Sequence, residues 1–133
     1  MISYLDTSAA MKLLVAEAES DALAAYFQSP PAGTDERTLV ASWLLHTELH
    51  CAANRHPDEV GLDSVRILLD TVSLIDLTRG DLLTAGTLPG QLRSHDAMHL
   101  AVALRIGADE MLTYDAELGD AAAVAGMPVV QPR

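Results

Sequence analysis

The sequence contains little cysteine, few aromatic residues and no long hydrophobic run. Cys51 is the only cysteine among 133 residues, so an internal disulfide cannot form, which favours a reducing cytoplasm. Aromatic residues make up 4% of the chain, so Leu, Val and Ala must fill most of the core. No run is long enough to cross a bilayer, and the first residues lack the features of a secretion signal. These absences predict one cytoplasmic domain over residues 1–133 with no membrane partner.

Positive charge is also scarce. Lysine and arginine total 8, whereas aspartate and glutamate total 19, and the net charge is −11 at pH 7. A surface of this average charge repels nucleic-acid phosphates, so the chain is not a general DNA-binding protein. An acidic surface often serves solubility alone. The positions of the acids along the chain therefore decide whether some of them form a cation site.

Short β-type runs alternate with longer helical stretches. We predict strands at residues 2–5, 38–42, 72–77, 110–114 and 129–130. We predict helices at residues 6–14, 20–28, 43–55, 57–69, 81–85, 94–106 and 115–125, with Pro57 in a first turn and Ser94 as a cap. This alternation indicates an α/β fold whose central, mainly parallel sheet has helices on both faces. Ligands of such sheets bind beyond the carboxyl ends of the strands.

Two acidic residues lie on the apolar faces of predicted helices. The residues three and four positions from Glu48 are all apolar: Leu44, Leu45, Cys51 and Ala52. Asp96 begins a second apolar stripe that continues through Leu100. A buried carboxylate is normally paired or bound to a metal. The alternatives are that Glu48 reaches water or an arginine at the edge of its stripe, and that Asp96 only interacts with the helix dipole.

Two further acids, Asp6 and Asp115, directly follow predicted strands. Each has an ordinary alternative role as a helix cap. All four acids, however, map to one end of the predicted sheet, where like charges would raise the pKa of each carboxyl group. We therefore expect Glu48→Gln to stabilise the metal-free protein. Bound Mg²⁺ or Mn²⁺ would relieve the repulsion and could activate water for phosphodiester hydrolysis.

Four other polar residues lie close in sequence to these acids. The hydroxyl groups that we expect to orient the carboxylates belong to Thr7, Ser8 and Thr113. Arg93 precedes Asp96 by three residues, so we predict that it lies at the rim of the site and contacts an RNA phosphate. The alternative is an ordinary surface arginine.

Three long segments carry a family resemblance: YLDTSAAMKLL, LLHTELHCAANR and LRSHDAMHLAVALRIGADEMLTYDAEL. Together with AGMPVV they resemble the PIN-domain ribonucleases, and among them the VapC-type toxins of bacterial type II toxin–antitoxin pairs. The resemblance implies a PIN-like three-layer sandwich, a Mg²⁺ (or Mn²⁺) site and cleavage of a structured RNA. It also implies a homodimer and a VapB-type antitoxin, through which alone the protein would reach DNA.

The same resemblance assigns the four acidic family positions to Asp6, Glu48, Asp96 and Asp115. Thr113 resembles the hydroxyl residue two positions before the last acid. Asp120 corresponds only loosely to an accessory acid. One departure is the scarcity of Lys and Arg, which leaves few candidates for RNA contacts.

The sequence gives less support to other functions. The pairs His46/His50 and His95/His99 have the spacing of zinc ligands but lack a suitably placed Glu, so we expect solvated surface histidines. A haloacid-dehalogenase-like phosphatase needs a second Asp where Ser8 stands. A PIN-fold binding module without catalysis remains a separate possibility, because a fold alone does not prove an activity. RNA cleavage measured while metal is titrated would separate that module from an enzyme.

Overall fold

The computed structural model describes residues 1–31, 33 and 36–133. These residues form a five-stranded, wholly parallel sheet in the order β3-β2-β1-β4-β5. The strands are β1 (Ile2–Leu5), β2 (Thr38–Ser42), β3 (Ser73–Ile75), β4 (Glu110–Leu112) and β5 (Val129–Val130). The predicted α/β class with a parallel sheet is therefore confirmed.

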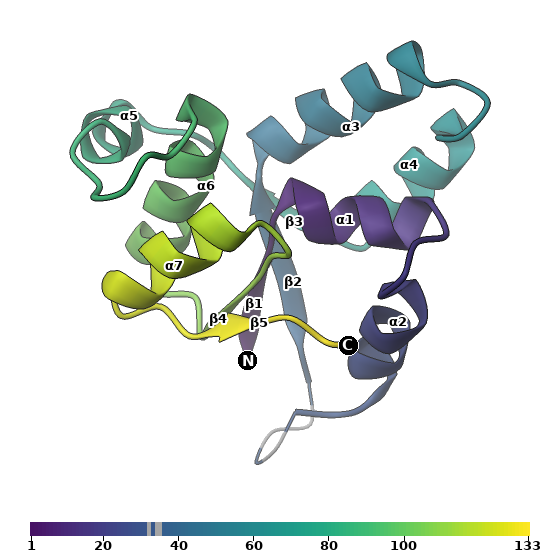
Figure 1. The fold of residues 1–133 in the computed structure, drawn as a ribbon, viewed down its shortest axis with the longest axis horizontal. Helices are drawn as coiled ribbons and strands as arrows, with labels where there is room; N and C mark the ends of the chain where they lie inside the picture. The colour runs from purple at the N-terminus through teal and green to yellow at the C-terminus, as the bar shows by residue number, and fades with distance from the viewer. Residues whose placement is uncertain (32, 34–35) are drawn as a thin grey trace.

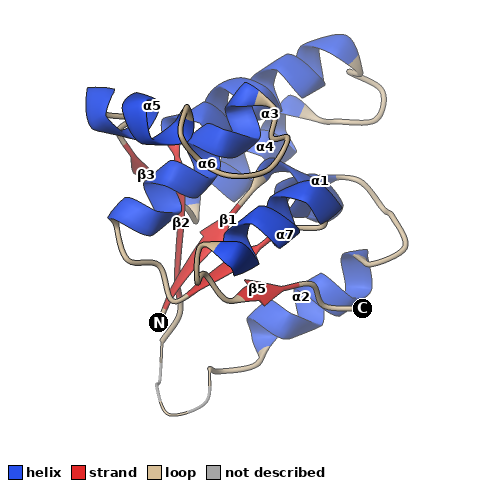
Figure 2. Ribbon diagram, turned by 60° about the vertical axis from the view of Figure 1, so that its left-hand side comes forward, coloured by secondary structure: helices blue, strands red, loops and turns tan. Residues whose placement is uncertain are grey.

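The described residues also form seven helices around this sheet. They are α1 (Thr7–Leu14), α2 (Ser20–Gln28), α3 (Trp43–Arg55), α4 (Leu62–Asp70), α5 (Arg79–Ala85), α6 (Ser94–Arg105) and α7 (Ala116–Val124). Figure 1 shows α5, α6 and α7 on one side of the strands and α1, α2 and α4 on the other, and Figure 2 shows the strands enclosed between these layers. No helix in the described residues is both long and apolar enough to span a membrane.

Successive strand residues face opposite layers, as the pleat of a sheet requires. Tyr4 packs into the core cluster formed with α6 and α7, whereas Leu5 packs into the cluster formed with α1, α2, α3 and α4. Met111 and Leu112 divide between the same two clusters. Both faces of the sheet are therefore buried, which explains why the strands read as short apolar runs rather than as alternating ones.

Several details of the predicted elements are wrong. The helix predicted from Pro57 begins instead at Leu62, because residues 57–60 form a turn in which the amide of Val60 donates to the carbonyl of His56. β3 covers only three of the six residues predicted for it. At α6 the cap residue is Arg93 rather than Ser94, and no side chain accepts a hydrogen bond there.

The end of β4 also differs from the prediction, and the reason concerns the site. The strand stops at Leu112, although the sequence suggested residues 110–114. Beyond it, the Thr113 hydroxyl donates to Asp6 and the Tyr114 amide donates to the Ser8 hydroxyl. These two residues are thus committed to α1 and its N-cap instead of to a neighbouring strand.

The order of the strands places a switch in direction between β1 and β4. From β1 the chain adds β2 and β3 on one side, and then β4 and β5 on the other. The amide of Asp6 donates to the carbonyl of Leu112, which joins the carboxyl ends of the two strands. A crevice for a ligand is expected at such a switch point.

Candidate active site

Asp6 is held rigidly at the carboxyl end of β1. Its side chain is buried, and its Oδ1 accepts hydrogen bonds from the Ser8 hydroxyl (2.7 Å) and the Ala9 amide (3.1 Å). Its Oδ2 accepts from the Thr113 hydroxyl at 2.8 Å. Burial raises the pKa of Asp6 above its ordinary value, although these hydrogen bonds act in the opposite direction. Asp6 is therefore an ordered carboxyl group in a place unfavourable to its charge.

Asp96 interacts electrostatically with both Asp6 and Asp115. Asp96 is in the first turn of α6, and Asp115 is the N-cap of α7, where its Oδ1 accepts from the Leu118 amide. Burial, together with the charges of Asp115 and Asp6, raises the pKa of Asp96, while His95 and Arg93 lower it. The charges of Asp6 and Asp115 thus both act on Asp96 near the switch point, which supports the assignment of the three predicted acids to one cluster.

Arg93 partly compensates this repulsion. Its Nε lies 3.6 Å from Asp96 Oδ2, and its Nη2 lies 3.6 Å from Asp115 Oδ2. The guanidinium group therefore bridges the two carboxylates, at the rim that the sequence predicted. Its side chain is 69% exposed, so solvent screens the two ion pairs and leaves the group accessible to a phosphate.

Glu48 lies at the margin of this cluster. On α3 the buried residues are Leu45, Leu49 and Ala53, so Glu48 is at the edge of the apolar face rather than within it. Its Oε1 lies 2.7 Å from Nε2 of His99. Burial acts to raise the pKa of Glu48, but hydrogen bonds from His99 and Thr7 act in the opposite direction, and the pKa is lowered.

This partner changes the expectation for Glu48→Gln. A lowered pKa means that the folded protein favours the ionised carboxylate of Glu48. Repulsion among the four acids, which we expected from the sequence, would have opposed the ionised form. We now expect Glu48→Gln to lower the melting temperature in EDTA at pH 7, because it removes a favourable charge. Melting curves of the two proteins test this, and a higher melting temperature for the variant would restore the original expectation.

The interpretation of His99 as a solvated surface residue is wrong. His99 is fully buried, and its Nδ1 lies 2.7 Å from the hydroxyl oxygen of Tyr4. Sequence reasoning missed this residue, although a signal existed: His99 lies three positions after Asp96, within a stretch of α6 that is buried from Ala97 to Ala103 apart from Met98. A polar residue in such a stretch needs a partner.

In the part of the chain that the structure describes, the other histidines of the two pairs have separate contacts. His46 and His50 stack on each other along α3, with ring centroids 4.1 Å apart. His95 is 38% exposed, and its Nε2 lies 3.5 Å from Asp96 Oδ1. The His95/His99 pair is therefore divided between two different acids, Asp96 and Glu48, instead of sharing one ion.

The three predicted hydroxyl residues contact the acids. Ser8 and Thr113 both donate to Asp6, and the Thr113 oxygen also accepts from the Asp115 amide at 3.2 Å. Thr7 lies on the Glu48 side, with its Oγ1 3.3 Å from Nε2 of His99. The hydroxyl groups therefore connect the acids to the ends of β1 and β4.

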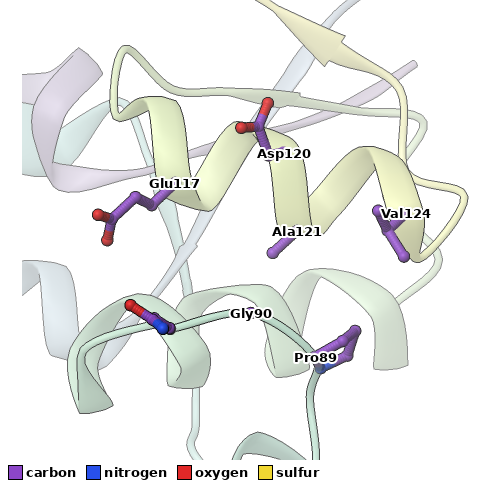
Figure 3. Close-up of a pocket in the computed structure, with 7 residues that line it drawn as sticks. Pro89, Gly90, Glu117, Asp120, Ala121 and Val124 are labelled. Atoms are coloured by element: carbon purple, nitrogen blue, oxygen red, sulfur yellow. The ribbon is translucent and has the colours of Figure 1, made fainter.

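Asp120 lies elsewhere on the surface. It is exposed on α7 and lines a shallow pocket with Pro89, Gly90 and Ala121. Figure 3 shows this pocket between α7 and the segment that contains Pro89 and Gly90. The structure gives no contact between Asp120 and the three clustered acids, so the loose assignment of an accessory acid gains no support.

The chemistry of these side chains fits a hard divalent cation. In the described part of the chain, no three His, Cys, Asp or Glu side chains are close enough as they stand to form a ready coordination sphere. The acids offer only oxygen atoms, which Mg²⁺ and Mn²⁺ prefer, and their mutual repulsion favours a cation. A cation that bound Asp96 and Asp115 would compete with the Arg93 guanidinium for both carboxylates.

Known proteins with similar sequences extend over almost the whole chain. Residues 3–124 match the PIN domain family. Ribonuclease VapC46 of Mycobacterium tuberculosis is 38% identical, over 97% of this chain and 96% of its own. Ribonuclease VapC35 of the same species is 36% identical with the same coverage.

Solved structures agree in fold. VapC20 of Mycobacterium tuberculosis, a sarcin-ricin loop cleaving toxin, has a TM-score of 0.73 at 18% identity and covers 98% of this chain and 99% of its own. VapBC2 from Rickettsia felis, bound to a DNA fragment from their promoter, has a TM-score of 0.76 at 13% identity and covers both chains completely. Because the sequence matches run through nearly all of the chain and the observed fold agrees with them, this chain belongs to the PIN domain family.

Proposed function

We propose that this protein is a metal-dependent endoribonuclease and the toxin of a type II toxin–antitoxin pair. The observation that supports this most strongly is the group of carboxylates Asp6, Asp96 and Asp115 at the switch point of a PIN fold, where Arg93 pairs with both Asp96 and Asp115. The relatives named ribonucleases cover nearly the full chain. The reaction is hydrolysis of an RNA phosphodiester bond, with Mg²⁺ or Mn²⁺ as the cofactor.

The site residues have different roles in the proposed reaction. Asp6, Asp96, Asp115 and Glu48 would hold the cation, and Ser8 and Thr113 keep Asp6 in one orientation. When bound, the cation would lower the pKa of a water molecule and stabilise charge on the leaving oxygen. Arg93 is placed to donate to a phosphate oxygen at the exposed rim. The chain's own contribution is thus a group of carboxylates, of which Asp6 is held by hydrogen bonds, and one exposed cationic side chain.

Divalent metal should stabilise the folded protein. Millimolar Mg²⁺ or Mn²⁺ should raise the melting temperature by several degrees, since a ligand at 100 times its Kd contributes about 2.7 kcal/mol. The rise should shrink as the pH falls, because the raised pKa values of Asp6 and Asp96 let protons compete with metal. Melting curves with metal and with EDTA measure it. An equal rise in Asp96→Asn would place the metal elsewhere.

Removing Arg93 should have two opposite effects. Arg93→Ala should weaken RNA binding and lower the slope of log affinity against log salt by about one. It should also tighten metal binding, because the guanidinium no longer competes for Asp96 and Asp115. Arg66→Ala is a matched control, since the Arg66 side chain is 65% exposed and its ion pair among the described residues is with Asp63. A salt slope equal to that of the control would make Arg93 an ordinary surface residue.

Partners follow from the same proposal. Toxin–antitoxin complexes among the structural neighbours support a VapB-type antitoxin as the partner, and we propose that DNA is reached only through it. With a net charge of −11, the chain itself opposes DNA phosphates. We also propose a homodimer, which light scattering of the isolated protein would test.

A further inference from the structure

A continuous chain of hydrogen bonds runs through the core to Glu48. It starts at the Ser42 amide, which precedes α3 and donates to the hydroxyl oxygen of Tyr4 at 3.1 Å. The Tyr4 hydroxyl lies 2.7 Å from His99 Nδ1, and His99 Nε2 lies 2.7 Å from Glu48 Oε1. Tyr4 and His99 are both fully buried, so water has no access to replace either partner.

The groups at both ends of His99 agree on the direction of these bonds. The ionised Glu48 carboxylate can only accept, so it requires a proton on Nε2. The Tyr4 oxygen already accepts from Ser42, and His99 Nδ1 is the acceptor available to the Tyr4 proton. The imidazole proton then lies on Nε2 and points at the Glu48 carboxylate. The other tautomer would direct a nitrogen lone pair at the carboxylate.

We propose that Tyr4 and His99 are positioning residues for Glu48: they fix the imidazole tautomer and thereby hold one glutamate oxygen in place at the edge of the acidic cluster. The inference deepens the proposed function, because it depends on Glu48 serving the metal site. The Glu48 side chain is 20% exposed and can adopt many conformations when it is free. Thr7, whose Oγ1 lies 3.3 Å from Nε2, attaches this arrangement to the start of α1, next to Asp6.

A purely structural role of His99 predicts a different set of results. Its ring also packs edge-on against Tyr4, with centroids 5.7 Å apart, so a substitution can destabilise the core without affecting Glu48. A positioning role requires two further effects. The tautomer must depend on the Tyr4 hydroxyl, and metal affinity must fall in folded protein.

The tautomer can be measured in the metal-free protein, independently of any activity. Long-range ¹H–¹⁵N spectra distinguish protonated from unprotonated imidazole nitrogens, and His99→Gln assigns the signals among the five histidines. We expect the ring proton to lie on Nε2 in the unmodified protein and to be distributed between both tautomers in Tyr4→Phe. Protonation at Nδ1 in the unmodified protein, or an unchanged pattern in Tyr4→Phe, would overturn the proposal.

Metal affinity provides the second measurement. Titration with Mn²⁺ in a calorimeter should show about tenfold weaker binding for Tyr4→Phe and His99→Leu, as is typical when a group that orients a metal ligand is lost. His99→Gln should bind more tightly than His99→Leu, because an amide N–H can still reach Glu48. Tyr26→Phe is a matched control: it also removes a tyrosine hydroxyl, but one that donates to the carboxylate of Glu110 at the amino end of β4.

The outcomes separate the two proposals. Unmodified protein that neither binds Mn²⁺ nor cuts RNA would refute the proposed function, whatever the tautomer of His99. Unmodified protein that binds Mn²⁺ and cuts RNA, with Tyr4→Phe and His99→Leu binding Mn²⁺ equally well, would refute only the positioning role. Each variant is compared below its own melting temperature, so that a loss of stability is not mistaken for a loss of metal affinity.

Discussion

Replacing Asp6 or Asp96 by asparagine should reduce RNA cleavage by several orders of magnitude while the protein stays folded. An asparagine oxygen carries no full charge, so the site would attract a divalent cation much less, and activation of water would be lost with the cation. Folding should persist because the amide of an asparagine at position 6 can still accept from Ser8 and Ala9. At position 96 the carboxylate opposes folding, since its pKa is raised.

The measurement is cleavage of total RNA at several Mg²⁺ and Mn²⁺ concentrations, with circular dichroism as the test of folding. Asp70→Asn is the matched control, because it removes the same charge from an exposed position at the end of α4, which carries none of the proposed site residues. In EDTA, Asp96→Asn should melt at a higher temperature than the unmodified protein. Near-normal cleavage by both site variants would show that the chemistry lies elsewhere, and loss of cleavage in Asp70→Asn would indicate a nonspecific charge effect.

The parts of the site that sequence predicted are those set by local rules. Asp6 and Asp115 follow strands whose apolar residues are evident, and adjacent parallel strands necessarily end at the same edge. Thr113 and Ser8 lie within two residues of these acids in the chain, so their contacts with Asp6 follow from the same edge. Short sequence distances from strand ends thus account for these contacts.

The part that sequence did not predict depends on how two helices pack. His99 and Glu48 are 51 positions apart, on α6 and α3, and meet only because both helices reach the same end of the sheet. Helical periodicity reports which face of each helix is apolar, but it does not report which polar group of another helix lies opposite. For that reason the sequence predicted that the other acids raise the pKa of Glu48, whereas the hydrogen bond from His99 contributes to a lowered pKa. The predicted start of α4 is wrong for a local reason, because Pro57 is as compatible with a turn as with the first turn of a helix.

Neutralising the acidic cluster should also weaken binding of the antitoxin. The cluster already holds a guanidinium group, because Arg93 lies 3.6 Å from both Asp96 and Asp115. An Arg or Lys of the partner could therefore block the site by replacing the positive charge of the metal. The rest of the inhibitory segment should be short and amphipathic, with apolar residues in a groove beside the site.

The double variant Asp6→Asn, Asp96→Asn should bind the antitoxin encoded beside this protein at least about thirtyfold more weakly, since loss of one partner of a buried charge pair costs about 2 kcal/mol or more. Calorimetry or surface plasmon resonance with the isolated antitoxin measures the affinity. Asp58→Asn, Asp70→Asn is the control, because both of its positions are exposed and distant in sequence from the cluster. Equal affinity for the site variant and the control would mean that inhibition does not use the acidic cluster. Absence of an adjacent partner gene would contradict the toxin assignment itself, while the prediction for RNA cleavage would stand unchanged.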